Sequence, residues 1–219
     1  RFKCDWSSDV CSSDLRNPAK AQDSLAEAIR FDPSNGGAYV ALARIQQATG
    51  NARGAEQTLN ACLKTVPELL EAETLLSQIY FDTRRPDDAV RILEKVVSSA
   101  DARSLTPGDH GQRVARYRAL LWLAYLYLNH QKRPREADRA TEFAMRLHQG
   151  DPELLDLRGW IQHQLGNEDQ AVALLSELTA RAPGYAMAHF HQAQIYDGRK
   201  DRAKALAELN AALGSTAPF

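Results

Sequence analysis

The chain has 219 residues, of which 44% are hydrophobic and 25% are charged, as in a soluble protein with a sizeable core. The formal net charge of -1 argues against a nucleic-acid partner, because binding to a polyanion needs a concentrated basic surface. The most apolar stretch, from Ala119 to Leu128, is shorter than the about 20 residues that span a membrane, and predicts a buried helix.

Residues 1–15 are expected not to belong to the native chain. The stretch from Cys4 to Leu15 reads CDWSSDVCSSDL. Written back into codons, it resembles a common short-read sequencing adapter, so we expect residues 1–15 to be a disordered, non-native tail. Cys4 and Cys11 would otherwise suggest a disulfide or zinc ligands, but they lack the close spacing and the second pair typical of zinc sites. Cys62 then remains, and its apolar context predicts a core position.

A period of 34 residues runs through the rest of the chain. Alanines recur at this interval in two series of three, separated by a gap of 48 residues. They are Ala21, Ala55 and Ala89, followed by Ala137, Ala171 and Ala205. In most repeats a leucine follows four residues later and a small or apolar residue seven later, which is the stripe of an amphipathic helix. The alanine itself would let a neighbouring helix approach closely.

A second set of small residues marks another helix in each repeat. These residues come twelve or thirteen positions before the alanines and are Ala43, Ser77, Ala124, Gly159 and Ala193. The turn sequences TGN and LGN, at residues 49–51 and 165–167, separate the two helices of a repeat. Pro33, Pro67 and Pro183 separate successive repeats, because proline is tolerated at the start of a helix and not inside one.

This pattern resembles the tetratricopeptide repeat (TPR), in which two antiparallel helices occupy 34 residues. The resemblance covers residues 16–213 and rests on the in-phase alanines, since the tryptophan of the family's first motif position is absent throughout. It implies an all-α, right-handed α-solenoid in which each helix pair buries its apolar stripe against the next pair. An ordinary helical bundle is the alternative.

The expected organisation is one repeat array. An orphan helix at about 17–31 precedes helix pairs at 36–69, 70–98, 117–150, 152–185 and 186–213, and residues 214–219 form a tail. The extra residues between the two alanine series predict an insertion at about 99–112, acting as a spacer or as a partner-contacting loop. Because the array opens on a lone second helix and ends without a polar capping helix, we expect a fragment of a longer protein.

No catalytic, cofactor-binding or metal-binding site is expected. The six histidines are scattered, and His189 and His191 are two residues apart, unlike the i, i+4 pair of a helical metal site. The sequence has no phosphate-binding glycine loop and no nucleophile motif. We therefore expect a non-catalytic interaction scaffold, soluble in the cytoplasm or the periplasm.

The family resemblance implies a concave groove lined by the first helix of each pair, near positions 2, 5, 9 and 12 of the unit. These positions mix aromatic and amide residues with a few charged ones, among them Glu71, Glu153 and Asp156, and aromatic residues are common interface anchors. Three of the groove positions could instead be packing residues of a buried helix, because the surrounding segment is apolar almost all round; they are Leu121, Tyr125 and Leu128. The residues expected to contact a protein or peptide partner are Arg44, Gln47, Gln78, Phe81, Tyr125, Trp160, His163, Phe190 and Gln194.

Two alternatives concern the partner. Some family members bind the acidic tails of heat-shock chaperones through a lysine–asparagine clamp, which this chain does not match: the corresponding positions are Val40, Arg44, Glu71 and Leu75. The second alternative is that the chain is the repeat arm of a larger enzyme, or of an exopolysaccharide-export or secretion component, and that the other domain is missing from this fragment. The stretch AHFHQAQIY, at residues 188–196, is similar to bacterial repeat proteins of that kind.

Overall fold

The computed structural model describes residues 17–98 and 110–214, and the side chains of residues 96–98 are outside this description. The described residues form helices joined by short turns, without a strand, which confirms the all-α class. They divide into two compact units, the first ending at Leu93 and the second beginning at Glu94, within one helix. The tail expected at residues 1–15 and residues 99–109 of the expected insertion lie outside the described residues.

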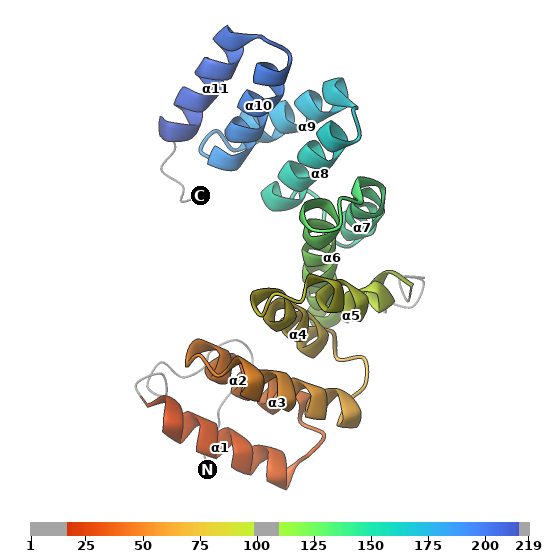
Figure 1. Cartoon of the computed structure of the whole chain (residues 1–219), viewed down its shortest axis with the longest axis vertical. Coiled ribbons are helices and arrows are strands. Elements are labelled where there is room, and N and C mark those ends of the chain that lie inside the picture. The colour runs from red at the N-terminus through yellow and green to blue at the C-terminus, as the bar shows by residue number, and fades with distance from the viewer. Residues whose placement is uncertain (1–16, 99–109, 215–219) are drawn as a thin grey trace. The chain divides into compact units, whose positions relative to one another are not determined.

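The first unit consists of α1 (Pro18–Phe31), α2 (Gly36–Ala48), α3 (Ala52–Thr65), α4 (Leu70–Asp82) and the start of α5 (Pro86–Ser98). Helices that follow one another in sequence pack together from α1 to α4, and α2 also contacts α4 (Figure 1). The first three helices begin at asparagine caps, which accept hydrogen bonds from backbone N–H groups three residues later. These caps are Asn17, Asn35 and Asn51.

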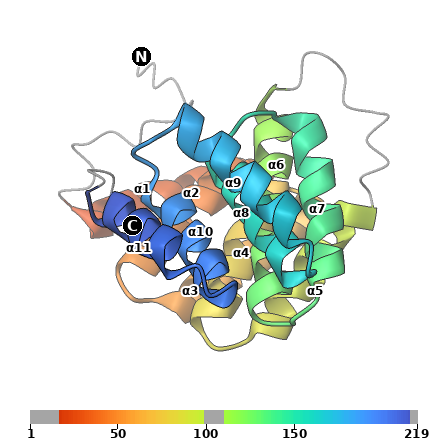
Figure 2. The same ribbon diagram turned by 90° about the horizontal axis from the view of Figure 1, so that it is seen from above.

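The second unit continues with α6 (His110–Asn129), α7 (Pro134–Leu147), α8 (Pro152–Gln164), α9 (Glu168–Arg181), α10 (Ala186–Gly198) and α11 (Arg202–Gly214). Each of these helices packs on the next, as α6 and α7 do side by side in both views (Figures 1 and 2). In addition α8 contacts both α6 and α10. Residues 110–112, which the expected insertion includes, form the start of α6. Among the described helices, none is both long and apolar enough to cross a membrane.

The periodic alanines lie where neighbouring helices meet. Ala55, Ala89, Ala137 and Ala171 are fully buried, and so is the residue four positions after each of them. Full burial of one leucine contributes roughly 1.5–3 kcal/mol relative to leaving it exposed. The equivalent leucine of α11, Leu209, is 38% exposed. The position is therefore leucine in every repeat except that of α7, where it is the buried Thr141, and it is completely buried in α3, α5, α7 and α9.

A close approach between the two helices of a pair explains the second set of small residues. A Cβ atom on Gly159 of α8 would lie 2.7 Å from Cγ of Leu175, a fully buried residue of α9. At the matching position in α4, the buried hydroxyl of Ser77 donates a hydrogen bond of 2.9 Å to the carbonyl oxygen of Ala89. There is no room at this position for a large side chain.

The turn between the two helices of a repeat requires a left-handed residue. Gly50 and Gly166, in the predicted turns TGN and LGN, have φ values of 79° and 82°. The other repeats place an ordinary residue in the same turn, with φ values of 64°, 54° and 60° at Arg84, Lys132 and Lys200. Such a conformation costs a residue with a Cβ atom roughly 1–2 kcal/mol.

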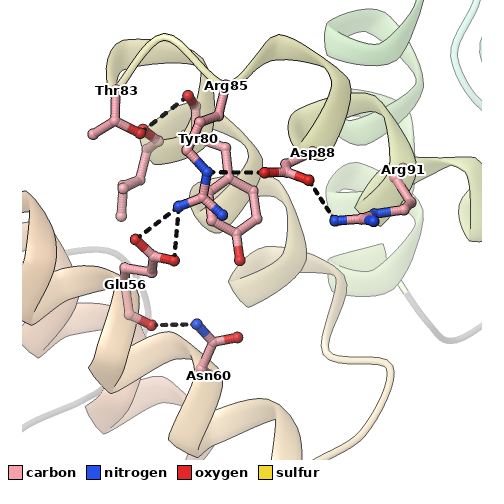
Figure 3. Close-up of polar contacts among 8 residues, drawn as sticks. Glu56, Asn60, Tyr80, Thr83, Arg85, Asp88 and Arg91 are labelled. Atoms are coloured by element: carbon pink, nitrogen blue, oxygen red, sulfur yellow. Dashed lines mark hydrogen bonds and ion pairs between the residues drawn. The ribbon is translucent and has the colours of Figure 1, made fainter.

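Charged side chains tie one helix pair to the next within the first unit. Figure 3 shows the Arg85 guanidinium between α3 and α5, where Nη1 lies 3.0 Å from Oε1 of Glu56 and Nε lies 2.8 Å from Oδ2 of Asp88. The guanidinium also covers the ring of Tyr80, 4.3 Å from its centroid. These contacts raise the pKa of Arg85, chiefly through its hydrogen bond to Asp88. Asp88 accepts a further hydrogen bond from Arg91 (Figure 3).

Replacing Gly159 with valine tests the close approach of α8 and α9. Because the new side chain would overlap Leu175, we expect a loss of about 1–3 kcal/mol in the free energy of unfolding, measured by urea denaturation. Gly198→Val is the matched control, since no heavy atom lies within 4 Å of a Cβ at that helical glycine. Equal losses in the two variants would show that the contact with Leu175 does not limit the residue at 159.

Replacing Lys200 with glycine tests the left-handed turn. Glycine removes the cost of the positive φ but loses more chain entropy on folding, so we expect a gain of up to about 1 kcal/mol. Gly166→Ala makes the opposite change in the equivalent turn and should lose about 1 kcal/mol. Thermal unfolding followed by circular dichroism gives both values, and a loss of stability in Lys200→Gly would contradict this account.

Candidate functional site

The nine residues expected to contact a partner all lie on the first helix of a pair. Four belong to the first unit, on α2 and α4, and five to the second, on α6, α8 and α10. The first set, called here the unit 1 face, is Arg44, Gln47, Gln78 and Phe81. The second set, called the unit 2 face, is Tyr125, Trp160, His163, Phe190 and Gln194. All nine retain some exposure to solvent.

The unit 1 face is held by polar contacts between its two helices. Nη2 of Arg44 on α2 lies 3.3 Å from Oε1 of Glu71 on α4, and both side chains are more than half exposed, at 53% and 55%. Nε2 of Gln47 donates a hydrogen bond of 3.1 Å to Oδ2 of Asp82. Exposed ion pairs of this kind contribute about 0–1 kcal/mol to stability. The charges on this face are therefore paired with one another.

The unit 2 face contains an aromatic cluster, defined as Trp160 and His163 of α8 with Phe190 and His191 of α10. The rings of Trp160 and His191 are stacked, with centroids 4.6 Å apart and planes within 15°. His163 lies on the same indole, with centroids 4.8 Å apart at 35°. Two imidazoles thus contact the Trp160 indole, one from α8 and one from α10.

Asp156 holds the cluster in place. Its Oδ1 lies 2.8 Å from Nδ1 of His191, and the two side chains are only 11% and 12% exposed. An imidazole that donates from Nδ1 satisfies this carboxylate while its ring stacks on Trp160. Sequence analysis placed Asp156 on the face but missed His191, which comes directly after a groove position. The available signal was its separation of 35 residues from Asp156, one repeat plus one.

The helix α6 combines packing and exposed residues. Leu121 and Leu128 are buried, at 8% and 5% exposure, so the packing role applies to them. Tyr125 is 40% exposed and stacks on Trp122, with ring centroids 5.2 Å apart and planes within 10°. Phe190, on α10, is 38% exposed. The unit 2 face thus presents aromatic surface from both of these helices.

An acidic group, defined as Asp151, Glu153 and Asp156, lies at the start of α8. Asp151 caps the helix, accepting a hydrogen bond of 2.9 Å from the backbone N–H of Glu153. Partial burial raises the pKa of Glu153, and repulsion from Asp151 and Asp156 adds to this effect. Burial raises the pKa of Tyr185, before α10, to about 12, and the same three carboxylates contribute. The structure therefore adds Asp151 to the two carboxylates, Glu153 and Asp156, that the expected groove positions already include.

Tyr117 of α6 lies beside Asp151 of the acidic group. Its side chain is buried, at 8% exposure, and its ring packs edge-on against His148. Burial raises the pKa of Tyr117, and the neighbouring Asp151 and Glu153 raise it further.

Among the described residues, no group of three or more histidine, cysteine, aspartate or glutamate side chains is arranged to hold a metal ion.

Comparisons with known proteins agree on the repeat. Two models described as tetratricopeptide repeat match the chain, one over residues 14–68 and the other over residues 157–218. No curated protein sequence matches significantly.

Several solved structures share the fold. The chain is similar to YrrB, described as a TPR protein with an unusual peptide-binding site, with 19% identity and a TM-score of 0.65 over 88% of this chain and 92% of that one. It is similar to pilF of Pseudomonas aeruginosa, with 19% identity and a TM-score of 0.68 over 90% and 84% of the two chains. A tetratricopeptide repeat protein from Parabacteroides merdae gives 16% identity and a TM-score of 0.72 over 94% and 77%.

The pKa of Glu153 predicts how stability depends on pH. Because this pKa is raised in the folded chain, the contribution of Glu153 to stability is full below its ordinary pKa of 4.5 and is lost as the pH rises through the raised value. Glu153→Gln removes that loss. We expect the variant to melt at a higher temperature than the parent at about pH 7, and the difference to vanish at about pH 4.

Glu142→Gln supplies the control for this measurement. Glu142 is an exposed residue of α7 outside the acidic group. Thermal unfolding of the three proteins at both pH values separates a local effect of the acidic group from the general effect of removing one negative charge. A lower melting temperature for Glu153→Gln at about pH 7 would contradict the prediction.

Proposed function

We propose that this chain, which belongs to the tetratricopeptide-repeat family, binds an extended peptide segment of a partner protein on its unit 2 face. Stacked repeats of this family form protein-interaction scaffolds, because the array exposes a continuous row of first helices. The first helices α6, α8 and α10 supply that row in the second unit.

The observation that carries the proposal is the packing of the Trp160 indole against His163 and His191. The indole is stacked on His191, which in turn is held by the nearly buried Asp156. An aromatic side chain that is ordered before binding loses little conformational entropy when a partner packs on it. Tryptophan is also among the residues that most often dominate the binding energy of interfaces. Trp160 is therefore the expected anchor.

The size of the face suits a short extended segment. Neighbouring packed helices are about 8–10 Å apart, so three first helices span roughly 20–30 Å, which is about 6–9 extended residues. The exposed Tyr125 and Phe190 lie on the two outer helices of the three, on either side of α8. The peptide-binding site named for YrrB is a property of that protein, and at 19% identity its likeness to this chain supports the fold alone.

The proposal gives this chain no catalytic step and no cofactor. A role as the repeat arm of a larger enzyme, or of an exopolysaccharide-export or secretion component, stays a prediction of the sequence. Binding on the unit 2 face is compatible with either setting, because it concerns what the repeats hold and not the activity of a further domain.

Selection from a library of random peptides of about ten residues tests the proposal directly. Peptides that bind the full chain would be labelled and titrated by fluorescence polarisation against the parent and against Trp160→Ala. Loss of a central aromatic anchor costs about 2 kcal/mol or more, so we expect affinity to fall by roughly 30-fold or more.

Phe31→Ala is the matched control, because Phe31 is an aromatic residue of α1 that is 92% exposed and lies off the unit 2 face. Its affinity for the selected peptides should equal that of the parent. Helical circular dichroism would first show that both variants are folded. Peptides that bind Trp160→Ala as tightly as the parent would refute the unit 2 face as the binding site.

A further inference from the structure

An exposed apolar stripe lies on α11, the last helix described in the second unit (Figure 1). Among the described residues, seven large hydrophobic side chains are exposed, and three of these are on this one helix: Leu206, Leu209 and Leu213. The other four are spread over α1, α6 and α10. Single exposed leucines are ordinary, but a row of them on one helix is typical of a surface that packs against another element.

The repeat indicates what kind of element fits this stripe. One period earlier, α9 carries Val172, Leu175 and Thr179 at the same three positions. Leu175 is fully buried there, in a core cluster that also contains Ala188 and Ile195 of α10, and Val172 packs against the cluster. The stripe of α11 therefore continues the face on which α9 receives the next helix, and has the form to receive a helix as well.

The stripe suits an apolar, uncharged surface. At about 100° per residue, its three leucines lie within roughly 60° of one another around the helix. Lys204 and Glu208 lie on the opposite side, where they pair with Asp201 at 3.0 Å and with His189 at 2.6 Å. The residues that flank the stripe are small or neutral: Ala203, Ala205 and Asn210. A charge placed against the leucines would lose its hydration without gaining a counter-charge.

A second copy of α11 meets these requirements when it runs antiparallel. The stripe is nearly symmetric about Leu209, since Leu206 precedes it by three residues and Leu213 follows it by four. A two-fold axis beside Leu209 places Leu206 of each copy against Leu213 of the other. Arg202, in the first turn, then lies near the C-terminal end of the other helix, whose last turn has no basic residue. The negative end of the helix dipole favours a cation at that place.

We propose that this chain forms a two-fold dimer, in which the α11 stripe packs antiparallel against the stripe of a second copy. One face of this 13-residue helix is about 20 Å long and 10 Å wide, and buries less than the roughly 1,200 Å² at which stable interfaces begin. The dimer is therefore reversible, with a dissociation constant on the order of 10–100 µM. It presents two unit 2 faces, so that a partner with two binding segments gains avidity.

Sedimentation velocity of the full chain tests the proposal at concentrations from about 2 to 500 µM. A thiol reductant prevents Cys4 and Cys11, which lie outside the described residues, from cross-linking two copies. We expect the sedimentation coefficient of the parent to rise from the value of a monomer to that of a dimer across this range, because the equilibrium follows mass action.

Two variants place a charge in the contact. Leu213→Glu and Leu206→Lys should each raise the dissociation constant by about tenfold or more, because the dimer would bury an unpaired charge. These leucines are 77% and 61% exposed, so both variants should keep the circular dichroism spectrum of the parent. Phe31→Glu is the matched control, because Phe31 is 92% exposed on α1, and this variant should dimerise like the parent.

A double variant tests the antiparallel arrangement. When Leu206→Lys and Leu213→Glu are combined in one chain, the two-fold axis sets the new lysine of each copy beside the new glutamate of the other. The double variant should therefore dimerise more tightly than either single variant. Equal or weaker dimerisation would overturn the antiparallel packing.

The remaining outcomes concern the dimer itself. A parent that stays monomeric at about 500 µM would overturn the proposal. Dimerisation that is unchanged in both Leu213→Glu and Leu206→Lys would rule out α11 as the contact, and growth beyond the dimer would rule out a closed two-fold pair. Peptide binding on the unit 2 face is measured separately, so none of these results bears on the proposed function.

Discussion

The close approach of two helices at a small residue is the constraint on which this structure depends. At Gly159, a single added carbon would overlap the buried Leu175, and elsewhere the same position holds alanine or serine. Helices that pair this closely bury their apolar stripes completely, as the fully buried Ala55, Ala89 and Ala171 show. The spacing of the small residues therefore fixes which faces meet, and with them which faces remain for solvent.

The candidate site follows from that geometry. Because every first helix turns the same side toward its pair, side chains from α8 and α10 that are a repeat apart in sequence come into contact. The ring of His191 reaches Trp160 and its Nδ1 reaches Asp156 for this reason. The two units differ in the pairing of their charges. Arg44 and Glu71 form an ion pair in the first unit, whereas Glu153 in the second unit has two carboxylates as neighbours. Regular packing thus supports faces of quite different chemistry.

The fold could be predicted from the sequence because it depends on residues that recur. Six alanines in phase predicted the all-α repeat, and glycine marked the turns at Gly50 and Gly166. The same turn at Arg84 and Lys200 carries no such signal, since packing of the two helices forces a positive φ on an ordinary residue there. The site was less predictable. Family positions indicated the first helices, but the contacts of His191 and Tyr117 depend on residues that lie off those positions and on distances between helices.

The leucine that recurs in each second helix is buried to different extents, so the helices should differ in how readily they unfold locally. Leu175 is sealed between helices, whereas its counterpart Leu209 keeps 38% of its surface in water, along with the neighbouring Leu206 and Leu213 at 61% and 77%. Among the described helices, α11 packs chiefly against α10, whereas α8 and α9 each pack against helices before and after them in sequence. Local opening should therefore begin there and spread inward one helix pair at a time, so that backbone amides of α11 exchange with solvent before those of α8 and α9.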